Sequence, residues 1–238
     1  MIKEKAWYQE AEKFLRTFPP FEVYPKTTAL LFVDFQNLTC NPERGILKTL
    51  GKTYPKEAEY MLSQVTGVTI PAAQKLLKFF RKNKMPVFYA EFGAAMEDGS
   101  DMIPLRKAAD EATRKKTGTG FVFSRFTYEY QTVDTLKPEP NELVINKKTR
   151  NAFTATSLDH TMRMIGIESV AIAGACSNIC VLATALGASD LGYKTILLND
   201  ASVTFSQAEH DAGMRLFHSY FGSVMDSDDL ITALSKHL

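Results

Sequence analysis

Five short apolar runs constrain the fold of this 238-residue chain more than any other feature of its sequence. The runs are nearly continuous and do not alternate with polar residues, which is typical of strands covered on both faces of a sheet. Segments with helical periodicity separate them, so strand and helix alternate. This order predicts an α/β fold with a parallel central sheet, helices on both faces and right-handed crossovers. The predicted strands are 28–33, 86–90, 142–146, 170–173 and 195–198.

Helices are predicted between and after these strands, with start and stop signals at several of their ends. Pro71 suits the first turn of one helix, and Gly166 and Gly192 stand where two others should end. The predicted helices cover about 71–82, 155–165, 179–191, 206–220 and 228–236.

Two long stretches, 38–69 and 93–139, fit neither pattern and are predicted to be loops. Connections of this length in a compact domain usually carry function, for example as lids or substrate loops. Within the second stretch, residues 121–130 are open to two interpretations, an edge strand or a contact with another subunit.

The chain length suits one α/β domain, and two small domains are the less favoured alternative. We therefore expect residues 1–238 to form a single domain, in which residues 1–27 are an N-terminal helical extension ahead of the first strand.

Charge and cysteine content bound the partners and the compartment. The net charge is +1, which indicates neither a nucleic-acid partner nor an anionic membrane. Three cysteines cannot all pair within one chain, and so low a count is typical of a reducing compartment. No run approaches the ~18 apolar residues of a membrane span, and the first residues lack a signal-type apolar core. The sequence predicts a cytoplasmic protein that binds neither nucleic acid nor membranes.

Three reactive side chains follow three different predicted strands. Asp34 comes directly after the first strand, Lys147 after the third, and Cys180 shortly after the fourth, which ends near Gly174. Sites in open α/β sheets form at the carboxyl ends of the strands, so we expect a carboxylate, an ammonium and a thiol at one edge.

Cys180 lies where a buried strand passes into a helix, a position with free backbone N–H groups and a positive helix dipole. We expect this setting and the lysine to lower the pKa of the thiol and make it a nucleophile, with Asp34 taking its proton. The backbone N–H groups of Cys176 and Cys180 are candidate donors to an oxyanion. The competing interpretations are a structural Asp34, an inert packed cysteine and a merely solvated lysine.

These residues lie in an ordered set of motifs. The set comprises Asp34-Phe35-Gln36, Lys147 followed after a short spacer by Ala152-Phe153, and the turn 174–180 with Val181 and the helix Thr184-Ala185. Gly192-Tyr193 and Asp200-Ala201 follow downstream. From about residue 28 to the C-terminus the chain resembles the isochorismatase-like cysteine hydrolase superfamily. The spacing to Ala152-Phe153 matches Lys147 rather than Lys148 to the lysine of that family.

The resemblance implies a three-layer α/β/α fold and a catalytic triad of Asp34, Lys147 and Cys180. It also implies a cis peptide between Ala175 and Cys176 that turns the Cys176 N–H into the oxyanion hole, and it implies a homodimer or homotetramer. The family usually has a small residue such as Ala or Thr at the position of Cys176, and this departure raises the alternative of a Cys176–Cys180 redox effect.

The resemblance also narrows the reaction. Members with the cysteine hydrolyse C–N bonds of small amides and ureides, and the nicotinamidases among them bind a metal through an Asp and two His after the second strand. Residues 91–98 contain no His here. We therefore expect no metal and no cofactor, and an amidohydrolase similar to N-carbamoylsarcosine, ureidoacrylate or biuret hydrolases that forms a thioester and releases ammonia or an amine. Isochorismatase-type and nicotinamidase-type hydrolases remain alternatives, as do a non-catalytic binding protein and a redox thiol protein.

Five residues beside the motifs are candidates for substrate binding: Phe35, Gln36, Phe92, Arg150 and Phe153. Arg150 is suited to clamp a carboxylate or carbonyl of the substrate, or equally to form a surface ion pair. The phenylalanines are candidates for the pocket wall, with core packing as the competing interpretation.

Overall fold

Six parallel strands form one sheet in the order β3-β2-β1-β4-β5-β6. The computed structural model describes residues 1–15 and 17–238. The strands are β1 (Thr28–Val33), β2 (Val87–Phe92), β3 (Leu143–Lys147), β4 (Ser169–Ala175), β5 (Lys194–Val203) and β6 (Ser223–Met225). The five strands expected from the sequence are confirmed. The short β6 was missed, because three residues carry too little pattern to be recognised.

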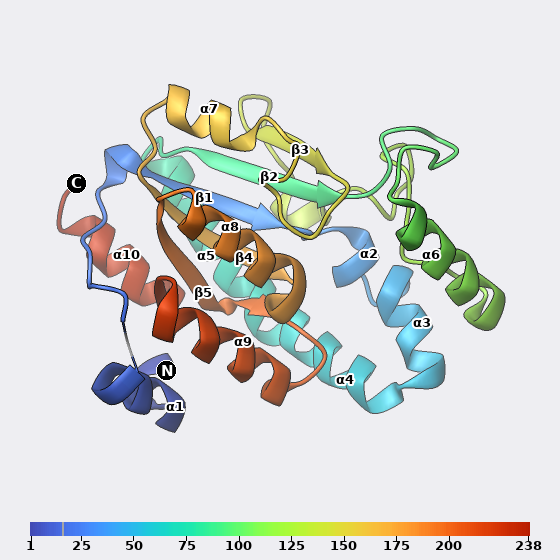
Figure 1. Ribbon diagram of the computed structural model, residues 1–238, viewed down its shortest axis with the longest axis horizontal. Helices are drawn as coiled ribbons and strands as arrows, with labels where there is room; N and C mark the ends of the chain where they lie inside the picture. The colour runs from blue at the N-terminus through green and yellow to red at the C-terminus, as the bar shows by residue number, and fades with distance from the viewer. Residues whose placement is uncertain (16) are drawn as a thin grey trace.

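Helices cover both faces of this sheet, so the predicted three-layer α/β/α architecture is confirmed (Figure 1). One face packs against α5 (Ile70–Lys82) and α10 (Ser227–Ser235). The other face packs against α7 (Leu158–Met164), α8 (Leu182–Asp190) and α9 (Gln207–Tyr220).

The chain changes direction across the sheet between β1 and β4. It runs outward from β1 through β2 to β3, and then crosses back to place β4 on the other side of β1. The connections leaving β1 and β4 therefore diverge, and a crevice opens at the carboxyl ends of these two strands.

The stretch 38–69 is mostly helical, so the prediction of a loop there is wrong. It holds α2 (Asn37–Cys40), α3 (Gly45–Thr53), α4 (Pro55–Gln64) and the π-helical turn η4 (Val65–Thr69). Gly45, Gly51, Pro55 and Gly67 interrupt the pattern, which hides each short helix in the sequence. Leu47, Met61 and Val65 nevertheless bury their side chains in the core.

The stretch 93–139 contains α6 (Pro104–Thr117) and the 3-10 turn η5 (Asp134–Leu136), so it too is only partly loop. Residues 121–130 form no strand, and Ser124 makes a single bridge to Ala94. Helices α2, α3 and α6 lie together beyond the carboxyl ends of β1 and β2, as Figure 1 shows.

The N-terminal segment packs against α9. It comprises η1 (Ile2–Glu4), α1 (Ala6–Glu10) and η2 (Ala11–Leu15), and η3 (Pro25–Thr27) leads into β1. Ile2 is buried in the core, and Lys5 pairs with Asp211 of α9. Within the part of the chain that the structure describes, no helix has both the length and the apolar character needed to cross a membrane.

Candidate active site

Asp34 and Lys147 form a buried ion pair at the carboxyl edge of the sheet. The distance between Asp34 Oδ2 and Lys147 Nζ is 2.8 Å, and both side chains are almost fully buried. Lys147 Nζ also donates to the carbonyl of Thr149 and lies over the ring of Phe92. The neighbouring lysine, Lys148, pairs with Asp101 instead.

The backbone around Asp34 is fixed by local contacts. Asp34 has a φ of 55°, a left-handed conformation that Asp tolerates better than most residues. The Thr39 hydroxyl donates to the Asp34 carbonyl. On the neighbouring strand, Gly174 lies so close to β1 that a Cβ would meet the carbonyl oxygen of Val33 at 1.9 Å. The Thr39 hydrogen bond thus fixes the backbone at Asp34, and the missing side chain at Gly174 lets the paired ends of β1 and β4 approach each other.

Cys180 lies in η6 (Ser177–Val181), the single π-helical turn that joins β4 to α8. Its thiol is close enough to Asp34 and Lys147 for both to change its pKa. Burial comes first and raises the pKa of Cys180 to about 12, and the negative charge of Asp34 adds to the increase, while Lys147 opposes it. The expectation of a lowered thiol pKa was therefore wrong, because desolvation and the carboxylate outweigh the lysine. The thiol is protonated at neutral pH and needs a base.

Asp34 has the properties of that base. Burial raises the pKa of its carboxyl group, against the opposing charge and hydrogen bond of Lys147. Although buried, its Oδ1 has no hydrogen-bond partner of good geometry among the described side chains and backbone, and the Cys180 thiol lies close enough to stabilise the ionised carboxylate. An unsatisfied buried carboxylate oxygen is costly, so it favours a donor that arrives with the substrate or the proton of the thiol.

The turn before Cys180 offers a further donor. The Ala175–Cys176 peptide bond is cis, and the Cys176 N–H donates no backbone hydrogen bond within the described residues. Side chains from outside the turn fix its first two residues, Ser177 and Asn178. His210 Nδ1 lies 3.0 Å from Ser177 Oγ, and the Thr204 hydroxyl donates to Asn178 Oδ1. Sequence reasoning missed these supports, because nothing near the motifs marks residues 204 and 210.

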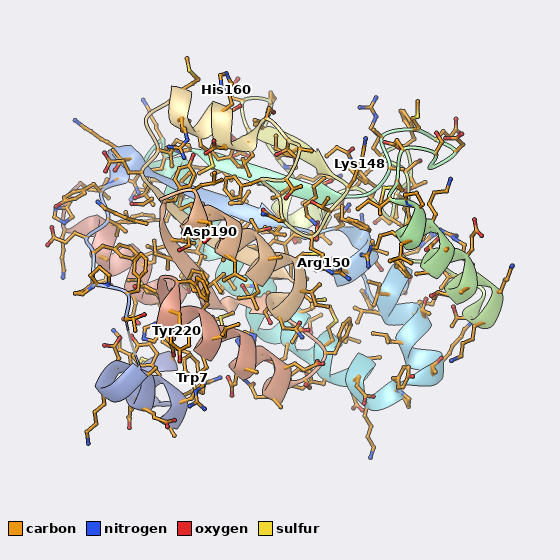
Figure 2. The ribbon with its side chains drawn as sticks, viewed as in Figure 1. Trp7, Lys148, Arg150, His160, Asp190 and Tyr220 are labelled. Carbon is orange, nitrogen blue, oxygen red and sulfur yellow. The ribbon has the colours of Figure 1, made fainter. Side chains whose placement is uncertain are left out.

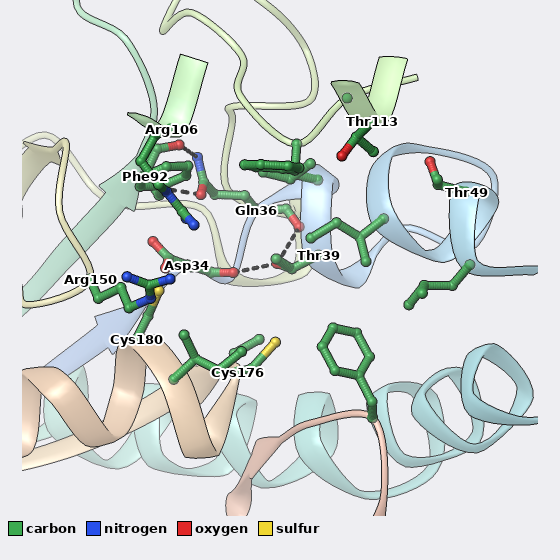
Figure 3. Close-up of a pocket in the computed structure, with 18 residues that line it drawn as sticks. Asp34, Gln36, Thr39, Thr49, Phe92, Arg106, Thr113, Arg150, Cys176 and Cys180 are labelled. Atoms are coloured by element: carbon green, nitrogen blue, oxygen red, sulfur yellow. Dashed lines mark hydrogen bonds between the residues drawn. The ribbon is translucent and has the colours of Figure 1, made fainter. Parts of the chain in front are cut away.

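A cavity of about 290 Å³ opens over these groups. Asp34, Cys180, Arg106 and Arg150 gather at one end, and Thr49 and Thr113 lie at the other (Figure 3). Most of its remaining wall is apolar and includes Leu38, Ile46, Leu50, Phe121, Ile179 and Phe205. The two stretches predicted as functional loops thus supply much of the wall, through α2, α3 and α6.

Three of the five predicted substrate residues line this cavity: Gln36, Phe92 and Arg150. The amide of Gln36 is already occupied, since Nε2 donates to the carbonyls of Phe92 and Tyr130 and Oε1 accepts from the Phe92 N–H. Gln36 therefore fixes the wall rather than offering a free polar group.

Phe35 and Phe153 lie elsewhere, which corrects their assignment to the pocket wall. Phe35 is 1% exposed and packs edge-on against Phe32 in the core. Phe153 stacks on Tyr193 and packs against the core beneath α7 and α8. For both residues the competing interpretation, core packing, describes what the structure shows.

Arg106 is the charged lining residue that sequence reasoning missed. It belongs to α6, in a stretch predicted to be loop, and no motif distinguishes it from the other basic residues of that helix.

Figure 2 shows Lys148 and Arg150 beyond the carboxyl end of β3, whereas His160 lies on α7 away from it. Among the described residues, no group of three or more His, Cys, Asp or Glu side chains is arranged to hold a metal ion.

The chain matches one protein family in sequence and resembles several solved structures in fold. Residues 28–229 match the isochorismatase domain family. A cysteine hydrolase from Pseudomonas syringae pv. phaseolicola is similar in fold, with a TM-score of 0.75 at 21% identity over 93% of this chain and 100% of that one. An isochorismatase family protein from Burkholderia thailandensis has a TM-score of 0.68 at 25% identity, covering 90% and 98%. N-carbamoylsarcosine amidase from Thermoplasma acidophilum has a TM-score of 0.60 at 23% identity, covering 85% and 97%.

Proposed function

The chain belongs to the isochorismatase family of hydrolases, and on this premise we propose that it is a cysteine hydrolase for the C–N bond of a small linear amide or ureide. One observation carries the proposal. A buried Asp34–Lys147 ion pair, with one carboxylate oxygen unsatisfied, lies beside Cys180 at the polar end of a cavity. In this proposal Cys180 is the nucleophile, Asp34 the general base and acid, and Lys147 the group that positions Asp34 and keeps it ionised.

The first half of the reaction transfers the acyl group to sulfur. The thiol proton of Cys180 passes to Asp34 as Sγ attacks the substrate carbonyl carbon, whose oxygen becomes an oxyanion. The Cys176 N–H, which donates to no backbone acceptor within residues 1–15 and 17–238, is the proposed donor to that oxyanion. Asp34 then returns the proton to the leaving nitrogen, the C–N bond breaks, and ammonia or an amine departs from the thioester.

The second half repeats this proton path with water. Asp34 takes a proton from water, the hydroxide adds to the thioester carbonyl, and the C–S bond breaks to give the acid product. The proton returns from Asp34 to the Cys180 sulfur, which restores the thiol. The high pKa of the resting thiol fits this scheme. The thiolate need not exist before the substrate binds, because the thiol proton is transferred to Asp34, whose pKa is also raised, during the attack.

The fold likeness to N-carbamoylsarcosine amidase supports this class, since that protein's name describes cleavage of an amide-type C–N bond. The test is ammonia release from a panel of ureides, carbamoyl amino acids and primary amides. We expect Cys180→Ser and Asp34→Asn each to lower kcat/KM by about 10²–10⁴-fold. Cys40→Ala serves as the control, because Cys40 is buried in the core and does not line the cavity.

Mass spectrometry gives an independent readout. Protein quenched in acid during turnover is expected to carry an acyl adduct on the peptide that contains Cys180, and Cys180→Ser should lack the labile adduct. Near-normal turnover by Cys180→Ser would contradict the proposed mechanism, as would a Cys176–Cys180 disulfide in active enzyme.

A further inference from the structure

Two arginines from different elements converge on the proposed reactive end of the cavity. Arg106 comes from the first turn of α6, and Arg150 comes from the connection that follows β3. Both line the cavity together with Asp34 and Cys180, and Figure 3 shows both guanidinium groups on the Asp34 side.

Neither guanidinium is neutralised by the protein. Within residues 1–15 and 17–238, neither makes an ion pair or a side-chain hydrogen bond. Other arginines of the chain show the contrast, because Arg81, Arg114 and Arg163 each hold a carboxylate of Glu142, Asp110 and Asp159 respectively. Asp34, the acidic group inside the cavity, is already paired with Lys147.

Arg106 is nevertheless held in place. Its guanidinium lies 5.2 Å from the ring centres of both Phe92 and Phe121. Phe121 is itself anchored, because its N–H donates to Asp110 Oδ1 one turn further along α6. Such a prepositioned fork loses little side-chain entropy when a ligand binds.

The two cations also act on each other. Burial, and then the nearby charge of Arg150, lower the pKa of Arg106. Asp34 and Asp110 offset this effect only in part, and neither forms an ion pair with Arg106, so an anion placed between the two arginines gains from both charges. Arg forks match the planar geometry of a carboxylate, and the apolar wall beyond them suits an uncharged, apolar substituent.

We propose that the substrate is an anionic amide or ureide, whose carboxylate lies close to the scissile carbonyl and is bound by Arg106 and Arg150. Its apolar substituent occupies the wall formed by α2, α3 and Phe205. The placement of the scissile bond at Cys180 rests on the function proposed above, whereas the anion subsite itself does not.

A matched set of three ureas tests the proposal. N-Carbamoyl-leucine has both features, 3-methylbutylurea is the same molecule without its carboxylate, and N-carbamoyl-glycine lacks the apolar substituent. We expect N-carbamoyl-leucine to have the highest kcat/KM of the three. Arg106→Gln and Arg150→Gln should each lower its kcat/KM by about 10–100-fold, mainly through KM, and lower that of 3-methylbutylurea by a much smaller factor.

Two further variants serve as controls. Arg106→Lys keeps the charge and loses the fork, so it should recover part of the loss. Arg163→Gln removes an arginine that is bound to Asp159 on the surface of α7, and it should alter none of the three substrates. Circular dichroism checks that each variant is folded.

Binding to Cys180→Ser separates this proposal from the proposed function. Calorimetry should show N-carbamoyl-leucine binding at least about tenfold more tightly than 3-methylbutylurea, and Arg106→Gln in this background should remove the difference. Hydrolysis of all three ureas with no charge preference would overturn the anion subsite and leave the hydrolase proposal standing. Arginine-dependent binding without hydrolysis would support the subsite and count against the proposed reaction. Absence of both would overturn the subsite.

Discussion

At the scale of single residues, the role of Lys147 is to set the charge of Asp34. Burial alone favours the neutral carboxylic acid, and the lysine at 2.8 Å opposes that effect. The same lysine only partly offsets the high pKa of Cys180. Its influence on the proposed reaction therefore passes mainly through the base, which must be ionised to accept the thiol proton.

Replacement of Lys147 by Met is expected to move the pH dependence of hydrolysis. Without the ammonium, the pKa of Asp34 rises further, so the fall of kcat/KM on the acid side should occur at higher pH than in the wild type. Lys148→Met is the matched control, because Lys148 pairs with Asp101 instead of Asp34. An unshifted acid limb in Lys147→Met would contradict this account of the pair.

The residues of the proposed triad were predictable because each follows a strand whose apolar run is unmistakable. Strand ends in a parallel sheet meet at one edge, so sequence position alone brought Asp34, Lys147 and Cys180 together. Arg106 was not predictable by this logic, since it reaches the cavity from a helix that lies beyond the sheet. The thiol pKa was also beyond sequence reasoning, because burial depends on the whole surrounding fold.

At the scale of elements, the close approach of β1 and β4 determines where the site forms. Gly174 pairs with Val33 across the two strands, and its φ of 142° and missing side chain permit this distance. Asp34 follows Val33, and the turn that carries Cys180 follows β4. The distance between the thiol and Asp34 therefore depends on the distance between the two strands.

A methyl group at Gly174 should therefore be more damaging than a methyl group at an unhindered glycine. In Gly174→Ala the Cβ would meet the Val33 carbonyl oxygen at 1.9 Å, and we expect a loss of about 3 kcal/mol in the free energy of unfolding. Gly192→Ala is the comparison. Its φ of 89° is also unfavourable for alanine, but beyond its two chain neighbours no described atom lies within 4 Å of the added Cβ, so we expect about 1 kcal/mol. Urea unfolding measures both, and equal losses would show that backbone conformation, not contact with β1, decides the cost.

The elements that sequence reasoning missed share a physical cause. Helices α3 and α4 are short, with Gly51 inside α3 and Pro55 at the start of α4, so neither offers the long uninterrupted apolar pattern that marks a helix in a sequence. Their place in the structure comes from tertiary burial of a few side chains such as Leu47 and Met61. The strands needed no such support, because their own residues define them.

At the scale of the whole molecule, two buried titratable groups outside the proposed triad make opposite contributions to stability. His210 bridges Ser177 and Asn199, and burial lowers its pKa to about 4. Glu91 of β2 accepts a hydrogen bond from Thr132, and burial raises its pKa to about 7. Between the lowered pKa and the ordinary pKa of His210, the folded protein binds one proton less at that residue than the unfolded chain does. Between the ordinary pKa and the raised pKa of Glu91, the folded protein binds one proton more there.

The signs follow from linkage. Between about pH 4 and 6.5 the unfolded chain holds the proton at His210, so this residue makes stability rise with pH by ~3 kcal/mol. Between about pH 4.5 and 7 the folded protein holds the proton at Glu91, so that residue makes stability fall with pH by ~3 kcal/mol. The two terms nearly cancel in the wild type.

Single variants should expose each contribution. His210→Gln lacks the rise in stability that His210 gives the wild type. Its free energy of unfolding, relative to the wild type, is therefore expected to fall between pH 4 and 6.5 and to stay constant above that. Glu91→Gln should gain stability relative to the wild type as pH rises from 4.5 to 7, because no buried charge forms. Denaturant unfolding across pH 4–8, taken as the difference from the wild type, removes the shared contribution of Asp34, whose pKa is also raised. Parallel pH profiles for all three proteins would show that neither group titrates differently in the folded and unfolded states.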